Sequence, residues 1–472
     1  LFCSKSLMDV QPTSDTPNWR IAIIGSGPSA FYAAQALFKQ DSWPLRVDMF
    51  ERLPTPYGLV RGGVAPDHQK IKSVIKIYER IASNERFRFF GNVEFGRDVS
   101  REDLLEHYDA VLYAVGSSSD RQLGVPGEDV SGVHSATEFV GWYNGHPDYR
   151  HWQFDLSSKS VAIIGMGNVA IDVARILAHR MQEIEVTDIA DHALQELAGS
   201  QIEDIYLIAR RGPVQAAFTP VEARELLEMP EADALANPEE LQLDEGSQQE
   251  LDAAGRETRQ NLEILNKMAE RGNTGKPKRL RFVFLTSPAE VLSEGGKVTG
   301  LKLERNVLKQ RNGKLSATGS GETFTLDCGL VFRSIGYKGL PQPGLPYDAK
   351  SGTVPNQQGQ VFNPETGAAC LREYVAGWVK RGPSGVIGTN KPDAVESVRT
   401  MLQTFLDEKW QPKEATGVAE IEALLESRQV DTVSFSDWKR LDEYEVRAGQ
   451  ESGKPRRKVS DPEEMLRIIR SG

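Results

Sequence analysis

Residues 21–30 read IAIIGSGPSA, and residues 161–170 read VAIIGMGNVA. Each segment opens with four apolar residues typical of a buried strand and continues into two glycines separated by one residue. Helices are predicted after the two turns, over residues 31–38 and 171–177. A strand, a glycine turn and a helix in this order form the context that a dinucleotide fingerprint requires.

Each small residue of these turns has a physical task in binding a dinucleotide. The first glycine (Gly25, Gly165) permits the tight turn, and the second (Gly27, Gly167) lets the backbone approach a pyrophosphate. The small third residue, Ala30 in the first turn, allows close packing of helix on strand beneath the positive helix end. One such motif is weak evidence, but two in matching context imply a flavin and a nicotinamide held face to face, and hence an oxidoreductase.

The composition is that of a globular protein with more than one domain. At 472 residues the chain exceeds the size at which single cores stop growing, and 39% hydrophobic and 26% charged residues are ordinary values. The net charge of -11 argues against nucleic acid as the main partner, and no apolar run approaches the length of a membrane span. The three cysteines lack Cys-x-x-Cys spacing and the histidines form no ligand-spaced cluster, so we expect no metal site and assign the redox chemistry to organic cofactors.

The first residues show no recognisable targeting signal. Residues 1–18 mix polar and apolar types without a secretory apolar core, and we expect a disordered N-terminal tail there. The low cysteine count favours a reducing compartment. We therefore expect the bacterial cytosol, with the mitochondrial matrix as the alternative if the first residues are a processed remnant.

The first unit continues with a predicted strand over residues 46–50 that ends in Glu51. An acidic residue about 20 or more residues beyond the glycine turn is expected to bond a ribose hydroxyl of the adenosine half. Residues 53–68 are rich in turn formers, and we predict a long functional loop that is too irregular for a helix. The elements expected after it are a helix over 70–81 and strands over 87–93 and 110–116.

Two arginines follow the distal strand of the second unit. Residues 205–209 read as a strand that runs directly into Arg210 and Arg211. An acidic residue at this place would bond a bare ribose diol, whereas guanidinium groups offer forked donors to a 2′-phosphate. NADPH is therefore predicted over NADH. The alternative is a solvated pair at a strand end.

Two charged stretches follow. Residues 228–257 are acidic and helix-prone, which indicates a solvated outer face. Residues 276–281 are basic and precede strand-like segments. The basic stretch either receives an acidic protein or balances nearby acids on the surface.

The C-terminal third contains a strand that ends at Trp378 and a glycine-rich turn. Asn390, with Pro392 nearby, is predicted to cap a helix that continues toward Phe405. A helix N-terminus directed at the pyrimidine side of a flavin would stabilise the negative charge of the reduced ring. The alternative is a plain strand-turn-helix with Trp378 in the core.

Several long segments in the chain go beyond generic dinucleotide binding. They closely resemble the adrenodoxin-reductase-like ferredoxin–NADP⁺ reductases, and the resemblance runs from about Ile21 to the C-terminus. The segments that carry it are residues 53–61, 64–68, 86–93, 210–219 and 381–390.

The resemblance implies an α/β fold with two Rossmann-like dinucleotide-binding domains of the glutathione-reductase-like kind. In such a fold both ends of the chain build one domain and the middle builds the other. Residues 19–117 and 345–472 would form the FAD-binding domain. Residues 118–344 would form the inserted NADP-binding domain.

The resemblance also assigns cofactor contacts residue by residue. Those expected to line FAD are Gly25, Gly27, Ser29, Ala30, Glu51, Leu59 and Val93. Those expected to contact the flavin and to lie near the nicotinamide are Trp378, Gly385, Val386 and Ile387. Gly165, Gly167, Asn168 and Val169 would meet the NADP pyrophosphate, and Arg210, Arg211 and Glu222 would hold its adenosine-phosphate end.

By the same resemblance, His68 and Glu225 would approach the nicotinamide as orienting or proton-handling groups. Hydride transfer itself needs no base, although histidine has a suitable intrinsic pKa for such a role. The alternative is a histidine at a helix start and a solvated glutamate.

The electron count then predicts the reaction. NADPH gives up two electrons as a hydride, whereas an iron–sulfur ferredoxin takes one at a time, so FAD is needed between them. We predict a monomeric reductase that moves electrons from NADPH through FAD to a small ferredoxin. A flavin-dependent monooxygenase and a non-enzymatic nucleotide-binding module are the alternatives, since fold does not prove function.

Overall fold

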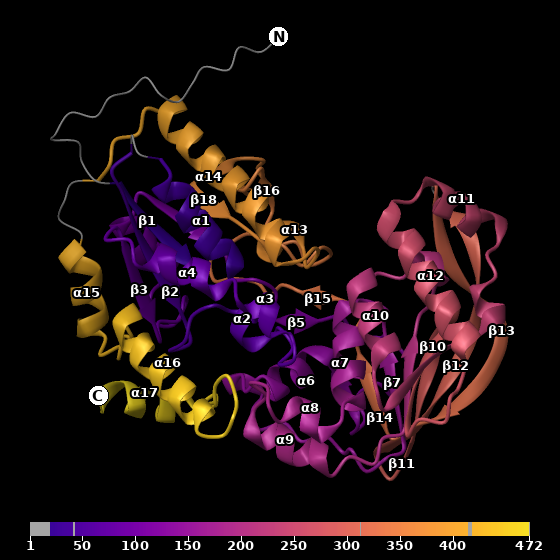
Figure 1. Cartoon of the computed structure of the whole chain (residues 1–472). Helices are drawn as coiled ribbons and strands as arrows, with labels where there is room; N and C mark the ends of the chain where they lie inside the picture. Colours follow the sequence, from indigo (N-terminus) through magenta and orange to yellow (C-terminus); the bar gives the residue numbers. More distant parts are fainter. Residues whose placement is uncertain (1–18, 41–42, 312, 414–417, 472) are drawn as a thin grey trace.

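The structure is a computed structural model that describes residues 19–40, 43–311, 313–413 and 418–471. The predicted tail over residues 1–18 lies outside the described residues. Figure 1 shows two lobes, each built around a β-sheet, with segments of both chain ends in the same lobe. None of the helices in the described ranges is both long and apolar enough to cross a membrane.

The first lobe is built on a seven-stranded sheet in the order β16-β17-β18-β4-β1-β2-β3. The strands from β18 to β3 run parallel, and β17 and β16 add an antiparallel edge. Its strands are β1 (Trp19–Ile24), β2 (Leu45–Glu51), β3 (Phe87–Gly91), β4 (Ala110–Tyr113), β16 (Asn356–Gln357), β17 (Gln360–Phe362) and β18 (Ala369–Val375).

The second lobe is built on a six-stranded, fully parallel sheet in the order β6-β14-β7-β8-β10-β9. Its strands are β6 (Val133–Ser135), β7 (Ser160–Ile164), β8 (Asp204–Ile208), β9 (Ala232–Ala236), β10 (Lys278–Val283) and β14 (Leu330–Arg333). A three-stranded antiparallel sheet accompanies it, formed by β11 (Thr286–Glu294), β12 (Lys297–Arg311) and β13 (Lys314–Asp327).

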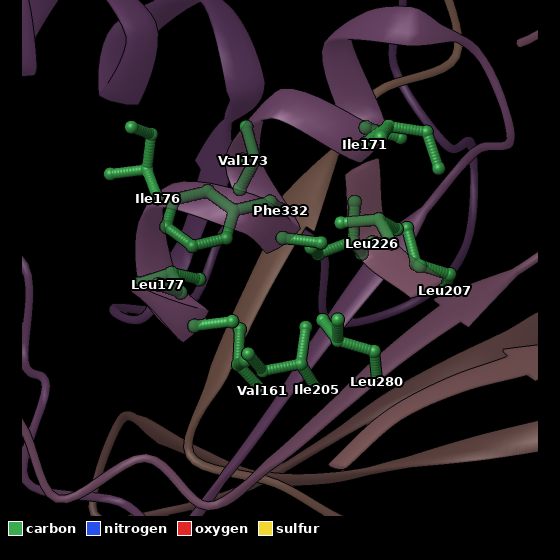
Figure 2. Packing of buried hydrophobic residues seen from close by; sticks show 14 of the residues in the cluster. Val161, Ile171, Val173, Ile176, Leu177, Ile205, Leu207, Leu226, Leu280 and Phe332 are labelled. Atoms are coloured by element: carbon green, nitrogen blue, oxygen red, sulfur yellow. The ribbon is translucent and has the colours of Figure 1, made fainter. Parts of the chain in front are cut away.

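Alternating side chains bury both faces of each sheet, as the period of a strand requires. In β1, Ile21 and Ile23 join the apolar cluster under α1, whereas Ala22 and Ile24 join the cluster on the opposite face. In β7, Val161 and Ile163 pack toward the helices (Figure 2), and Ala162 and Ile164 pack toward β11 and β12. The predicted α/β fold class with two dinucleotide-binding lobes is confirmed.

Helices cover these sheets and connect their strands. Those of the first lobe are α1 (Pro28–Phe38), α2 (Leu59–Gly62), α3 (Gln69–Lys72), α4 (Ile75–Ala82), α5 (Arg101–His107), α13 (Trp378–Arg381), α14 (Asn390–Asp407), α15 (Val418–Ser427), α16 (Phe435–Gln450) and α17 (Pro462–Arg470). Those of the second lobe are α6 (Ala136–Tyr143), α7 (Asn168–Ala178), α8 (Met181–Ile184), α9 (Asp191–Ala198), α10 (Pro220–Glu228), α11 (Glu245–Ala253) and α12 (Arg256–Arg271). Short 3₁₀ turns occur at Pro147–Tyr149, Pro213–Gln215, Pro238–Leu241 and Ile387–Thr389.

The two crossings between the lobes pair with each other. The strand β5 (Ser119–Asp120) bonds β15 (Tyr337–Lys338) in antiparallel register. Asp120 also accepts a hydrogen bond from Arg333, at the end of β14, at 3.1 Å. The outgoing and returning chain are therefore tied together where they cross.

Several local predictions were wrong. The loop over residues 53–68 contains the single helical turn α2, and the helix predicted over 70–81 is broken into α3 and α4. The acidic region 228–257 contains β9, a buried strand at the edge of the parallel sheet. Its short Ala-Asp-Ala-Leu-Ala sequence has little strand propensity, so the pairing with β10 decides its structure.

The basic stretch 276–281 balances acids within the lobe. It forms most of β10, where Arg279 and Arg281 both bond Asp204 at 2.7 Å. Lys278 donates to the carbonyl of Leu177 at 2.6 Å. These internal partners favour the surface-balancing interpretation over a receptor for an acidic protein.

Candidate dinucleotide sites and the groups between them

The first glycine turn joins β1 to α1 in a shape that glycine alone allows. Gly25 has a φ of 96°, and a Cβ atom there would lie 2.6 Å from the carbonyl oxygen of Ala114. A Cβ atom on Gly27 would meet no described atom within 4 Å. Gly27 is the N-cap of α1, and no side chain of the described residues caps that helix end. The backbone at this helix start is therefore open beside Gly27, which fits the approach of a pyrophosphate.

Glu51 is held against this turn. Its Oε2 atom accepts hydrogen bonds from the Ser26 amide at 3.1 Å and from the Ser26 hydroxyl at 2.6 Å. Its Oε1 atom accepts the Leu53 amide at 3.1 Å, and the Glu51 carbonyl accepts the amide of the predicted residue Val93 at 2.9 Å. The carboxylate is therefore oriented at the carboxyl end of β2, the place where a ribose-binding acid is expected.

The C-terminal segment meets the first turn from the other side. The Ser29 hydroxyl donates to Asn390 Oδ1 at 2.9 Å, and Arg381 donates to the same oxygen at 2.9 Å. Asn390 is thus the first residue of α14 rather than its cap, because Thr389 precedes the helix in the capping position. Its side chain ties the N-terminal turn to a helix 361 residues further along the chain.

The residues predicted to contact the flavin lie on this segment, and Leu59, predicted to line FAD, lies on α2. Trp378 begins α13 and its ring centroid lies 5.2 Å from that of Tyr337 on β15. Gly385, Val386 and Ile387 lie in the turn before α14, where Val386 is 56% exposed. Leu59, the first residue of α2, is 39% exposed. Apolar side chains exposed at these predicted contacts fit an apolar ring that would cover them.

The second glycine turn repeats the first between β7 and α7. Gly165 has a φ of 140°, and any side chain there would collide with the Ser334 carbonyl. A Cβ atom on Gly167 would meet nothing within 4 Å among the described atoms. Gly167 is the N-cap of α7, whose first turn has no capping side chain in the described chain. The backbone is therefore open beside Gly167 as it is beside Gly27, and Val169 packs half-buried against the core.

The segment after β8 folds back onto this second turn. The side chain of Asn168 accepts the Thr219 amide at 2.8 Å, and the Ala217 amide donates to the Met166 carbonyl at 2.9 Å. Arg210 is exposed and Arg211 half-exposed, and in the described ranges neither guanidinium has a protein acceptor. Two available cations at this strand end fit a 2′-phosphate.

His68 and Glu225 meet where the two lobes touch. His68 Nε2 lies 2.8 Å from Glu225 Oε2 on α10. Burial lowers the pKa of His68, but the bond to Glu225 and the carboxylates of Asp67 and Asp172 raise it more, so the net pKa lies above the ordinary value. The pair that the sequence suggested is brought together from positions 157 residues apart.

A buried arginine organises the acids around this pair. Arg175 on α7 is 2% exposed and bonds Asp67 and Asp172, each at 2.6 Å. It also bonds Glu222 at 3.0 Å. Burial and Asp172 raise the pKa of Glu222 to about 7. Glu222, predicted at the adenosine-phosphate end, thus lies beside Arg175 and 3.8 Å from His68, and none of its described bonds reaches Arg210 or Arg211.

Sequence reasoning missed Asp67, Asp172, Arg175 and His179 in this cluster. His179 lies 3.1 Å from Asp67, and Glu183 lies 3.0 Å from the other ring nitrogen of His179. One signal was available: Asp172 and Arg175 are charges within the mostly apolar sequence of α7. A charged residue is almost never fully buried unless it is paired, so its partners had to exist elsewhere in the chain.

Together the fold and these sites define the class of oxidoreductases with two dinucleotide-binding units. Residues 19–211 match the family model of pyridine nucleotide-disulphide oxidoreductases. The chain belongs, more narrowly, to the family of NADPH-ferredoxin reductases of the adrenodoxin-reductase type, and the predicted membership is confirmed.

Similarity to these relatives spans nearly the whole chain. NADPH-ferredoxin reductase FprA of Mycobacterium leprae is 45% identical, covering 95% of this chain and 98% of the relative. The mitochondrial NADPH:adrenodoxin oxidoreductase of Arabidopsis thaliana is 42% identical, covering 94% of each. The structure of Mycobacterium tuberculosis FprA in complex with NADPH superimposes with a TM-score of 0.90 at 44% identity, covering 96% of this chain and 100% of that chain.

Proposed function

We propose that this protein is an FAD-dependent NADPH:ferredoxin reductase. The observation that carries the proposal is the presence of two matched glycine turns, each beginning an uncapped helix in the described chain, on two sheets joined by paired crossings. The relatives that share its length are named as NADPH-ferredoxin and adrenodoxin reductases, which supports both the donor and the class of acceptor.

In this proposal each lobe holds one dinucleotide. The lobe formed by residues 19–117 and 345–472 holds FAD, with the α1 end on its pyrophosphate and Glu51 on a ribose. The lobe formed by residues 118–344 holds NADPH, with the α7 end on its pyrophosphate and Arg210 and Arg211 on its 2′-phosphate. When bound, FAD supplies the chemistry of accepting a hydride and releasing single electrons.

The groups of the chain then act by position and charge. His68 and Glu225 lie at the junction of the lobes, where they orient the nicotinamide end and hold or release a proton at His68 Nε2. Trp378 and the turn 385–387 cover the ring side of the FAD site and limit the entry of water. Asp67 and Asp172, both bonded by Arg175, raise the pKa of His68 and favour its protonated form, whereas the positive charge of Arg175 itself opposes it.

The acceptor in this proposal is a small iron–sulfur ferredoxin, and we propose that the protein acts as a monomer. The bacterial relatives support the cytosol over the mitochondrial matrix as its location. Arg279 and Arg281 of the basic stretch in β10 bond Asp204 of their own lobe, so we do not propose this stretch as the binding surface for the acceptor.

Reconstitution tests this function directly. Purified protein incubated with FAD should retain the flavin through gel filtration. Addition of NADPH in the absence of oxygen should remove the absorbance of the oxidised flavin. The reduced protein should then pass electrons to an added [2Fe–2S] ferredoxin. NADH should be a much poorer donor. A colourless protein that neither retains FAD nor oxidises NADPH would contradict the proposal, and stoichiometric hydroxylation of an organic substrate would select a monooxygenase instead.

A further inference from the structure

Asp188 is a buried acid that the proposed reaction does not use. It lies between α8 and α9, and its side chain is 3% exposed. Its carboxylate accepts hydrogen bonds from Lys72 Nζ at 2.6 and 2.8 Å and from Gln69 Nε2 at 2.8 Å. Lys458 Nζ lies 3.2 Å away on the other side. One carboxylate thus collects three donors in a site closed to solvent.

These donors come from distant parts of the chain. Gln69 and Lys72 belong to α3 of the first lobe, whereas Asp188 belongs to the second. Lys458 lies in the segment between α16 and α17 and also bonds Asn144 of the second lobe at 3.0 Å. Asp188 therefore joins α3 and the C-terminal segment to the second lobe at a single point.

The turn α3 begins directly after His68. The His68 carbonyl accepts the Ile71 amide at 3.1 Å and the Lys72 amide at 3.4 Å, so His68 is the N-terminal residue of that turn. A helix of four residues is not stable on its own, because one turn provides too few hydrogen bonds for the dihedral angles it fixes. Side chains of α3 that bind elsewhere therefore help to fix the position of His68, beside the bond of its neighbour Asp67 to Arg175, and two of those side chains bind Asp188.

Glu225, the partner of His68, belongs to the same lobe as Asp188. The 2.8 Å approach of His68 to Glu225 thus spans the same boundary as the bonds from Lys72 and Gln69 to Asp188. Any shift of α3 relative to the second lobe changes both the distance from His68 to Glu225 and the bonds from α3 to Asp188. We propose that Asp188 is a positioning residue, which anchors α3 across the lobe boundary so that His68 meets Glu225.

The charges at this point favour a permanent anchor. Burial alone would raise the pKa of Asp188, but the ammonium groups of Lys458 and Lys72 hold it well below its ordinary value. Burial in turn lowers the pKa of both lysines. Asp188 is therefore the negative charge that compensates the two buried ammonium groups, and its neutralisation leaves their mutual repulsion uncompensated.

Asp191 provides a matched control. It also spans the two lobes, since it bonds Lys454 at 3.0 Å and pairs with Arg457, both in the segment between α16 and α17. Its side chain is 37% exposed, and its described bonds do not include α3. Asp191→Asn therefore removes an ion pair across the boundary without releasing the turn that bears His68.

The test uses the FAD-loaded full chain and two measurements. Hydrogen exchange in the absence of NADPH measures the protection of residues 69–72. Stopped-flow reduction of the flavin by NADPH measures the consequence for the reaction, and this part rests on the proposed function. The variants are Asp188→Asn, Lys72→Met and Asp191→Asn, each alone and combined with His68→Gln. Lys72→Met removes the same bond from the α3 side if Asp188→Asn does not fold.

Asp188→Asn and Lys72→Met should each speed exchange at residues 69–72 and slow flavin reduction by about tenfold or more, because small displacements at a reacting site cost that much. Either change combined with His68→Gln should slow reduction no further than His68→Gln alone, since both act through one group. Asp191→Asn should leave both measurements near wild type.

Unchanged exchange at α3 in Asp188→Asn and Lys72→Met would overturn the proposal, as would rate effects that simply multiply with that of His68→Gln. A wild-type protein whose flavin is not reduced by NADPH would instead contradict the proposed function. In that case only the hydrogen-exchange measurement tests whether Asp188 anchors α3.

Discussion

The two glycine turns occur in the same order of strand, turn and helix, but the chain around them differs. At the first turn, Gly58 of the loop packs against Gly27, and Ser29 bonds Asn390 from the far end of the sequence. At the second turn, the contacts come from the segment directly after β8, and Arg210 remains exposed. A site closed by three separate segments suits a resident dinucleotide, whereas a more open site suits one that must enter and leave at each turnover.

The largest effects should come from the second glycine of each turn. A Cβ atom at Gly27 or Gly167 meets no described atom, so Gly27→Ala and Gly167→Ala should fold normally. Gly27→Ala should weaken FAD binding by about 100-fold, roughly 2.7 kcal/mol, because its methyl group occupies the pyrophosphate space. Gly167→Ala should raise the KM for NADPH and leave FAD bound. Flavin content after gel filtration measures FAD binding, and steady-state kinetics measure the KM for NADPH. Equal loss of flavin in both variants would contradict the assignment of FAD to the first lobe and of NADPH to the second.

Next in size is the choice of nicotinamide cofactor. The change Arg210→Ala with Arg211→Ala should lower kcat/KM for NADPH by about 10- to 100-fold, because a charge-assisted hydrogen bond contributes about 1.5–3 kcal/mol. The value for NADH should stay the same. Glu51→Gln is the matched control in the other lobe, where FAD affinity should fall without a change of nicotinamide preference. An unaltered preference in the arginine variant would refute the role of both residues.

A smaller effect concerns the side-chain hydrogen bonds that hold each glycine turn in place. Ser29→Ala removes a buried hydrogen bond to Asn390, which still accepts from Arg381, so we expect a loss of about 1 kcal/mol in the free energy of unfolding. Denaturant unfolding of the FAD-free protein measures it. Asn168→Ala removes the half-buried bond to Thr219 and should cost less. A larger loss in the free energy of unfolding for Asn168→Ala than for Ser29→Ala would contradict the inference that the first turn is held more firmly than the second.

The smallest effect lies between the lobes and depends on pH. The pKa of His68 is raised, so its stabilising bond to Glu225 is fully present below the unfolded histidine value of about 6.5 and is lost as the pH rises through the folded pKa. The pKa of Glu225 is lowered by the same bond, so its contribution is lost at acidic pH as the pH falls through that lowered value. The free energy of unfolding lost in His68→Gln should therefore be greatest near pH 5–6.5, at a few tenths to about 1 kcal/mol because Glu225 is partly exposed. A loss that does not change with pH would contradict the charged pair.

Much of the fold could be predicted because the decisive patterns are local. Four apolar residues before a glycine turn predict β1 and β7, and the periodicity after it predicts α1 and α7. Prediction failed where neighbours outweigh local preference. The strand β9 is short and lies in an acidic region, and it forms because it pairs with β10 at the edge of the sheet. The bonds of Gln69 and Lys72 in α3 to the second lobe are likewise contacts that no local pattern contains.

By itself, the sequence determined that two dinucleotides bind, in which order their units occur and which strand ends carry Glu51, Arg210 and Arg211, because glycine turns and strand ends depend on neighbouring residues. The tertiary structure alone decided that Arg175 holds the acids around His68 and that Asp188 anchors α3. The bonds from Arg175 to Asp67 and from Lys72 to Asp188 join residues more than 100 positions apart. Their energy comes from excluding water around charges that meet only after both lobes have folded.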